Sequence, residues 1–331
     1  MNADWIMILK SLGISLIVTI VLGPVIIPLL RRLKLGQNIR SDGPGSHLQK
    51  SGTPIMGGIM FLAGIATAGL WLANRSAEGM LVLGVTLAFG LIGFLDDFIK
   101  VYFKRPLGLR AREKLLGQVL FSALFVVLAV SVLGRGTDVV APYSGIFIPG
   151  GFSWEAGALG FPLFAGLVIV GTANSVNLTD GLDGLAAGVT ALVAAAYVFI
   201  ASGLDKTGTA VLMAAVVGGC LGFLFYNRHP ARVFMGDTGS LALGAALGAT
   251  AVVTRSELFL LIMGGIFVLE TMSVVLQVAS FQLLGRRLFR MSPLHHHFEL
   301  CNWSEKKVVF AFWAATVMFV FLGLAGFYGL G

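Results

Sequence analysis

Residues 81–100 read LVLGVTLAFGLIGFLDDFIK, an apolar run that ends in two adjacent carboxylates, Asp96 and Asp97. The run carries no charge before Asp96, so it predicts a helix that crosses most of a membrane. Placing two carboxylates at such a boundary costs free energy unless they are solvated or serve a function. They can be solvated at the interface, or they can bind a divalent cation or move a proton.

The composition places the whole chain in a membrane. Of its 331 residues, 57% are hydrophobic and 12% are charged, whereas soluble domains carry about 25% charged residues. The net charge of +7 lies in short loops between apolar runs, which indicates membrane topology and not nucleic-acid binding. The two cysteines are not expected to form a disulfide. We predict an all-α integral membrane protein that forms one polytopic domain over residues 1–331.

The hydropathy pattern predicts about ten transmembrane helices, because each crossing needs roughly 20 mainly apolar residues. The eighth segment is short and rich in glycine, and the ninth is longer than one crossing requires, so it should tilt, kink or project into water. The ten segments are 5–30, 55–73, 79–95, 115–133, 157–176, 185–203, 209–226, 239–254, 258–284 and 308–330.

The basic residues set the orientation of these segments. The loops that follow odd-numbered segments hold 18 of the 23 Lys and Arg residues, and the other four loops hold one each. The positive-inside rule then places the first set in the cytoplasm and both termini outside. In the longest outer segment, residues 134–156, the run Ile146 to Ile148 predicts a small hairpin.

The loop after the fifth segment, Asn174 to Gly184, reads NSVNLTDGLDG and has no basic residue. Asn177, Asp180 and Asp183 are three residues apart, so a helical turn would place them on one face. One interpretation is an Asx-rich turn that caps the next helix. The other is a binding site, because carboxylates and amides are typical ligands of metals and phosphates.

The loop after the seventh segment contains Asn227 and Phe234 and ends in GDTGS, residues 236–240, which should open the next helix. A carboxylate at a helix start, here Asp237, can serve as an N-cap. It can also bind a metal beside backbone amides that hold phosphate. The two roles do not exclude each other.

The loop after the ninth segment carries the run His295, His296 and His297. Adjacent histidines seldom all ligate one ion and no cysteine pair assists them, so phosphate or sugar hydroxyls are better partners than zinc. Lys50, Thr53, Lys100 and Lys114 lie in other cytoplasmic loops and face either anionic lipid headgroups or a diphosphate. Within the ninth segment, Glu270 predicts either a buried hydrogen bond or a role in a groove.

Four stretches resemble one family, the phospho-N-acetylmuramoyl-pentapeptide transferases of the polyprenyl-phosphate N-acetylhexosamine-1-phosphate transferase superfamily. They are LDDFIK at 95–100, NSVNLTDGLDG at 174–184, FMGDTGS at 234–240 and PLHHHFE at 293–299. Their order and the pattern of ten segments match the family over nearly the whole chain.

The resemblance implies transfer of phospho-MurNAc-pentapeptide from UDP-MurNAc-pentapeptide to undecaprenyl phosphate, which gives lipid I and UMP. It also implies Mg²⁺ as cofactor, a homodimer, and the bacterial inner membrane as location. The residues carried over by resemblance are Asp237, Asn177 and Asp97 for the metal; Asp96, Asp97, Asp237 and His295 for catalysis; Lys100, Lys114, Asn174, Asn177, Asp180, Asp183, Asn227 and Phe234 for the nucleotide and phosphates; and Lys50, Thr53, His295, His296 and His297 for the sugar side.

Two other functions are compatible with parts of the pattern. A sibling enzyme would transfer GlcNAc-1-phosphate, which the histidine run disfavours. A transporter would place its ionisable residues near the bilayer midplane and show internal repeats, whereas most of these residues lie at cytoplasmic ends. For the transferase we expect a single displacement, in which Asp96 takes the residual proton of the lipid phosphate or orients its attack, and Asp97 aids the metal.

Overall fold

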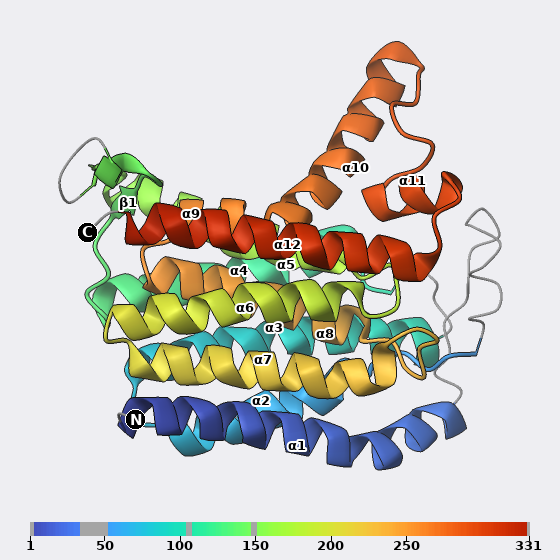
Figure 1. The fold of residues 1–331 in the computed structure, drawn as a ribbon, viewed down its shortest axis with the longest axis horizontal. Coiled ribbons are helices and arrows are strands. Elements are labelled where there is room, and N and C mark those ends of the chain that lie inside the picture. Colours follow the sequence, from blue (N-terminus) through green and yellow to red (C-terminus); the bar gives the residue numbers. More distant parts are fainter. Residues whose placement is uncertain (1–2, 34–51, 104–107, 147–150, 330–331) are drawn as a thin grey trace.

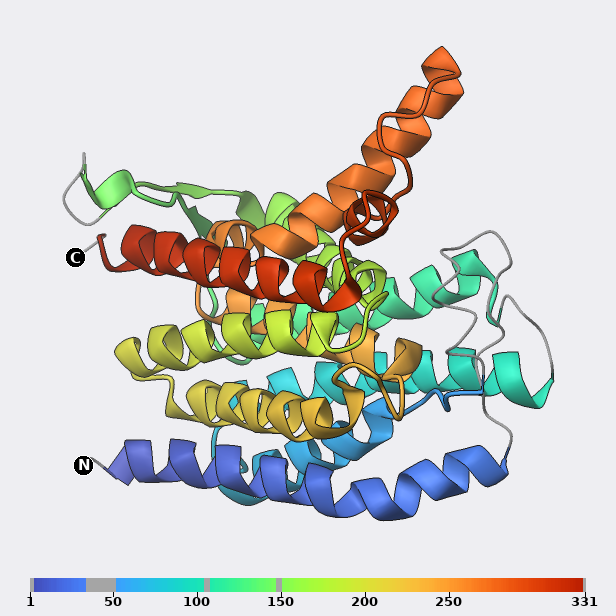
Figure 2. The same ribbon diagram turned by 45° about the vertical axis from the view of Figure 1, so that its right-hand side comes forward.

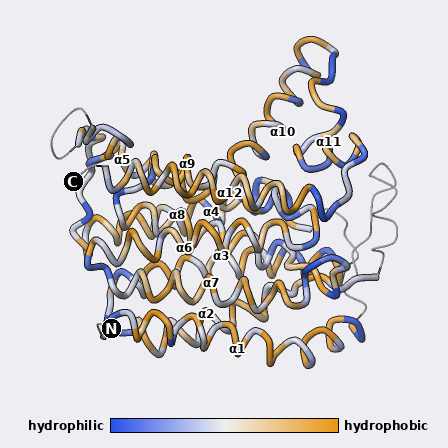
Figure 3. Tube along the Cα trace, viewed as in Figure 1, coloured by the Kyte–Doolittle hydropathy of each residue, from blue (hydrophilic) through white to orange (hydrophobic). Residues whose placement is uncertain are grey.

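The computed structural model describes residues 3–33, 52–103, 108–146 and 151–329, and these form a helical bundle (Figure 1). Apart from α10 (Gly265–Leu284), the longer helices lie side by side along one direction, with apolar residues along the length of the bundle and polar residues gathered at its two ends (Figure 3). The helices are α1 (Ala3–Arg32), α2 (Gly58–Leu72), α3 (Ala77–Tyr102), α4 (Ala111–Ser131), α5 (Gly157–Thr179), α6 (Leu185–Gly203), α7 (Thr207–Asn227), α8 (Gly236–Val253), α9 (Glu257–Met263), α10 (Gly265–Leu284), α11 (Leu294–Leu300) and α12 (Glu305–Tyr328).

Each of the ten predicted segments contains a helix. In the described part of the chain, eight helices are long and apolar enough to cross a membrane: α1, α3, α4, α5, α6, α7, α10 and α12. Helix α2 has 15 residues, fewer than the roughly 20 that a crossing needs. Helix α8 has 18 residues and begins with the polar turn GDTGS. The protein is an all-α integral membrane protein.

Helix α8 lies at the centre of the bundle and carries the site at its first turn. All its residues from Thr238 to Val253 are buried, and it packs against α3 and α5. Its glycines and alanines allow this close packing. At one crossing, a Cβ built on Gly93 of α3 would lie 2.1 Å from the backbone oxygen of Asp237, so α3 and the start of α8 touch through their backbones.

The ninth predicted segment is divided by a break in the helix. Helices α9 and α10 meet at Gly264, and α10 leaves the bundle at a steep angle, with its far end well beyond the other helices (Figures 1 and 2). Leu283 and Leu284 at that end are exposed. The chain then returns through α11 to the start of α12. This geometry agrees with the expected kink and projection.

A two-stranded hairpin lies at the end of the bundle where both chain termini are found (Figure 1). Strands β1 (Asp138–Val140) and β2 (Ser153–Glu155) pair antiparallel. The predicted hairpin was placed wrongly within the segment. Ile146 belongs to a 3-10 turn, Ser144–Ile146, and Phe147 and Ile148 lie outside the described residues. The prediction rested on the short apolar run itself, whereas the residues that pair lie on either side of it, at 138–140 and 153–155.

Candidate active site

The first turn of α8 is held by Asp97 of α3. The Asp97 carboxylate accepts hydrogen bonds from the Asp237 N–H at 3.2 Å, the Thr238 N–H at 2.9 Å and the Thr238 hydroxyl at 2.7 Å. A helix start leaves such N–H groups without intrahelical partners, so Asp97 caps α8 from another helix. Gly236 turns the chain into α8 with a φ of +70°, and a Cβ there would lie 2.4 Å from Asp97 Oδ2.

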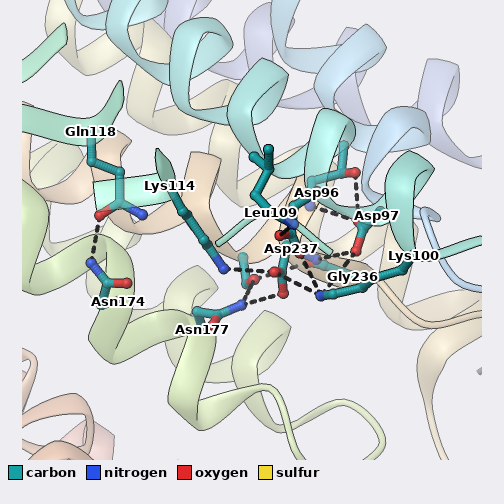
Figure 4. A network of polar contacts seen from close by, with 12 residues as sticks. Asp96, Asp97, Lys100, Leu109, Lys114, Gln118, Asn174, Asn177, Gly236 and Asp237 are labelled. Carbon is teal, nitrogen blue, oxygen red and sulfur yellow. Dashed lines mark hydrogen bonds and ion pairs between the residues drawn. The ribbon is translucent and has the colours of Figure 1, made fainter. Parts of the chain in front are cut away.

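The Asp237 carboxylate is the centre of a polar cluster (Figure 4). Its Oδ2 lies 3.0 Å from Lys100 Nζ and 2.6 Å from Lys114 Nζ. Its Oδ1 accepts a hydrogen bond of 2.8 Å from the side-chain amide of Asn177 in the last turn of α5, which also donates to the Ser240 hydroxyl. Four helices, α3, α4, α5 and α8, thus meet at one carboxylate.

Asp96 faces the same cluster from α3. Its Oδ1 accepts a hydrogen bond of 2.9 Å from the Leu109 N–H, and its Oδ2 lies 2.5 Å from Lys100 Nζ. The side chain is 2% exposed. Lys100 therefore lies between two carboxylates, those of Asp96 and Asp237.

Asp96, Asp97 and Asp237 form a group that could hold a metal ion. Each offers a carboxylate oxygen, and the three oxygens lie within 4.8 Å of one another. Oxygen ligands of this kind suit hard divalent cations. Three carboxylates this close repel one another, and the ammonium groups of Lys100 and Lys114 already lie against them. The donor set fits a divalent cation that shares the site with these two lysines.

Unlike Asn177, Asn174 does not bond to Asp237 but to Gln118 of α4. Its amide donates to Oε1 of Gln118 at 2.6 Å and to its own helix at Val170. Gln118 is 1% exposed and lies one helical turn after Lys114 on α4. Gln118 was not predicted from the sequence, although its four-residue spacing from Lys114 places both on one face of α4.

A second polar group lies where the loops after α5 and α7 meet the start of α12. Asp183 Oδ2 accepts a hydrogen bond from the Ala231 N–H at 3.0 Å and lies 3.1 Å from His229 Nδ1. The same nitrogen is 3.1 Å from Glu305 Oε2, while Glu305 Oε1 accepts from the Asp183 N–H. These three residues could also hold a metal ion. His229 and Glu305 were missed, and only their place in cytoplasmic loops pointed to them.

The predicted face of Asn177, Asp180 and Asp183 is not formed, because α5 ends at Thr179. Asp180 is the residue after the helix, and Asp183 turns towards the loop after α7. The side chain of Asn227 connects the same two loops. Its Oδ1 accepts a hydrogen bond from the Gly184 N–H, and its Nδ2 donates one to the Val233 backbone oxygen, both at 2.9 Å.

The three histidines have three different environments. His295 is buried against Glu270, with Nδ1 3.1 Å from Oε1. His296 Nδ1 lies 2.9 Å from Glu299 Oε2. His297 accepts the N–H of Arg290 at 3.2 Å. The histidines therefore do not form one ligand set.

Backbone pairing joins the chain around Thr53 to the loop before α8. The Phe234 N–H donates to the Pro54 oxygen at 2.9 Å, and the Gly57 N–H donates to the Phe234 oxygen at 2.8 Å. Thr53 therefore lies next to the segment that carries Phe234. Lys50 lies outside the described residues.

The chain is similar to known proteins of one family. A family model described as Glycosyl transferase family 4 matches residues 79–255. The phospho-N-acetylmuramoyl-pentapeptide-transferase of Pelotomaculum thermopropionicum is 62% identical, over 96% of this chain and 97% of the relative. Those of Desulforamulus reducens and Desulforudis audaxviator are 59% and 58% identical, over 98% of this chain and 96% and 99% of the relatives.

The family match covers α3 to α8, which include every residue around Asp237, and the relatives extend over nearly the full length. The chain belongs to glycosyl transferase family 4 and to the phospho-N-acetylmuramoyl-pentapeptide-transferases.

Proposed function

We propose that this protein transfers phospho-MurNAc-pentapeptide from UDP-MurNAc-pentapeptide to undecaprenyl phosphate, releasing UMP and forming lipid I in the bacterial inner membrane. The observation that carries the proposal is the meeting of Lys100, Lys114 and Asn177 at Asp237, in a chain whose relatives bear the transferase name over nearly their whole length.

The charges of this cluster suit a reaction between two phosphates. Donor and acceptor both carry negative charge and repel each other, and positive groups at the reacting phosphorus lower that barrier. Lys100 and Lys114 supply two ammonium groups at one point. The cluster lies at the end of the bundle opposite the termini, so a polyprenyl tail can remain among the helices while its phosphate reaches the site.

We infer that the cation at this site is Mg²⁺, with Asp237 and Asn177 as its principal holders and Asp97 in support. When bound, Mg²⁺ would neutralise diphosphate charge and stabilise the transferring phosphoryl group. Asp97 already fixes the backbone of Asp237 and Thr238, so its contribution includes holding the first turn of α8 in place. Asp96 and Lys100 face the reacting phosphates from α3.

The remaining residues would bind the donor. Asp180, Asp183, Asn227 and Phe234 would surround the uridine, and Asn174 would act from behind through Gln118. Thr53, His295, His296 and His297 would lie on the muramoyl side, together with Lys50. Membrane lipids surround the protein, and we propose that it functions as a homodimer.

The decisive experiment offers the purified protein undecaprenyl phosphate with radiolabelled UDP-MurNAc-pentapeptide or UDP-GlcNAc. Lipid-linked product and UMP from the first donor alone are the expected result. Product from UDP-GlcNAc alone would instead identify the sibling activity. Uptake of substrate into vesicles without release of UMP would identify a transporter.

A further inference from the structure

Glu270 of α10 is a buried acid that holds the returning chain. Its side chain is 0% exposed. Oε2 accepts the Leu294 N–H at 2.8 Å, and Oε1 accepts the His295 N–H at 3.2 Å. One carboxylate inside the membrane-spanning part of α10 therefore fixes the start of α11, after the chain has travelled out along α10 and back.

The same carboxylate determines which ring nitrogen of His295 carries hydrogen. His295 Nδ1 lies 3.1 Å from Glu270 Oε1. An ionised carboxylate can only accept hydrogen bonds, so Nδ1 must be the donor. In the neutral ring this leaves Nε2 unprotonated, with its lone pair as an acceptor. Carboxylates that orient a functional histidine in this way are common in protein sites.

The Nε2 atom of His295 is buried and has no hydrogen-bond partner among the residues that the structure describes. It faces Gly181, where a Cβ would lie 2.2 Å from it. Buried polar atoms without partners are rare, and each needs an explanation. Gly181 belongs to the loop after α5 and follows Asn177, the residue bonded to Asp237, by four positions.

We propose that Glu270 is a positioning residue that locks His295 in the Nδ1–H form, so that Nε2 accepts a hydrogen bond from a hydroxyl or amide N–H of the bound nucleotide-sugar donor. The proposal rests on the transferase function above and deepens it. Neither Asp237 nor Lys100 and Lys114 contact Glu270 in the described structure, so its effect on the site passes through His295 and the start of α11.

Two substitutions at His295 separate its nitrogens. His295→Asn places an amide N–H near the position of Nδ1, so the bond to Glu270 can persist while Nε2 is lost. His295→Gln places an amide oxygen near the position of Nε2 while the bond to Glu270 is lost. We expect at least a tenfold loss of kcat/KM for the donor in His295→Asn, smaller losses in His295→Gln, and an unchanged KM for polyprenyl phosphate in both.

Glu270→Gln tests the lock itself. In ¹⁵N-histidine-labelled protein without substrate, the wild type should show an unprotonated Nε2 signal that disappears in His295→Asn, and Glu270→Gln should shift this signal towards a mixture of tautomers. Kinetically, Glu270→Gln combined with His295→Asn should be no slower than His295→Asn alone. The glutamine carbonyl can still accept a backbone N–H at the start of α11, and the rest of the effect of Glu270 passes through the histidine. Ser273→Ala, which removes a hydroxyl bonded to the Glu270 backbone oxygen, is the matched control on the same helix.

A wild-type rate in His295→Asn would overturn the proposal, because the histidine would then be only a tether. An unchanged ¹⁵N signal in Glu270→Gln would overturn the lock. Equal losses towards both substrates in the variants would point to misplaced helices and would also contradict the proposal. The NMR measurement needs no turnover, so a failure of the lock is distinguishable from a failure of the transferase function, which the radiolabel assay on the wild type reports.

Discussion

Lys114 Nζ lies 2.6 Å from Oδ2 of Asp237, although the two residues are 123 positions apart in the chain. The contact joins the start of α4 to the first turn of α8, and Lys100 of α3 reaches the same oxygen. A carboxylate with two ammonium neighbours is held ionised by them. A metal ion or a substrate phosphate that enters the site must therefore share or displace these lysines, and that competition is measurable.

Replacing Lys114 should separate metal binding from turnover. In Lys114→Gln, Asp237 Oδ2 loses one of its cations, so less Mg²⁺ should be needed for half-maximal rate. The maximal rate should fall by about 10²- to 10³-fold, the loss typical when one preorganised donor is removed from developing charge. A magnesium titration of lipid-product formation checks both effects. An increased magnesium requirement would contradict competition between Lys114 and the metal.

Asp237→Asn should lose nearly all turnover while the protein still folds. The amide keeps the size of the side chain but removes the charge that a hard cation requires, and Asp97 still caps α8 through the backbone. Rates across a magnesium series, with a thermal melt in detergent, provide the measurement. The control is Asp205→Asn, an exposed aspartate at the opposite end of the bundle with a φ of +57° that asparagine tolerates. Full activity in Asp237→Asn would remove this residue from the site.

The orientation of the bundle can be tested with cysteine labels. In a background of Cys220→Ala and Cys301→Ser, Asn74→Cys should react with a membrane-impermeant thiol reagent in intact cells. Arg287→Cys should react only after permeabilisation. Both positions are exposed, and the basic residues place them on opposite sides of the membrane. Labelling of Arg287→Cys in sealed cells would reverse the orientation and move the site to the outer face.

The end of the bundle that carries the hairpin depends on a buried ion pair. Arg135 donates to Glu257 Oε1 at 2.7 Å, and their side chains are 3% and 0% exposed. Removing one partner leaves a buried charge, so Arg135→Met should lower stability by about 3–5 kcal/mol. Glu257→Gln, which keeps an acceptor for Arg135, should cost less. Melting temperatures in detergent test this order, and because the pair lies far from Asp237 the rate per folded molecule should not change.

The sequence predicted a helix in each of the ten segments because an apolar run is a local property, although α2 and α8 are not among the eight helices long and apolar enough to cross a membrane in the described part of the chain. About twenty apolar residues predict one helix wherever they occur, and positive loops orient the set. The central position of α8 could not be predicted this way. Its small residues showed that close packing was possible, but the partners, α3 and α5, are contacts at long range.

The site was predictable in residue type but not in pairing. Carboxylates and amides in cytoplasmic loops pointed to Asp96, Asp97 and Asp237, and the structure brings these three together. Two contacts depend on how the helices lie in space. Asp97 caps α8, and Glu270 contacts His295 after the chain has run out along α10 and back. No spacing along the chain reports such a relation, so the meeting of His229 and Glu305 was missed. Gln118 is different, because its four-residue spacing from Lys114 was a local signal.

The last prediction concerns whether Asp96 acts as a base or orients the attack. Both oxygens of Asp96 face donors, the Leu109 N–H and the Lys100 ammonium. A carboxylate engaged in this way is well placed to hold Lys100 and the loop before α4. A phosphate monoester has its second pKa near 6, so above about pH 7 most of the lipid phosphate needs no base.

Asp96→Asn should therefore be slower than the wild type by a factor that does not change between about pH 7 and pH 9. The amide can still accept from Leu109, but its N–H₂ group would face Lys100 and displace it. Recovery of most of the wild-type rate near pH 9 would identify Asp96 as the base. A phosphoryl group trapped on Asp96, with UMP released before lipid is added, would replace the single displacement by a covalent mechanism. A constant factor, together with no UMP burst in the absence of lipid, leaves orientation of the attack as the role of Asp96.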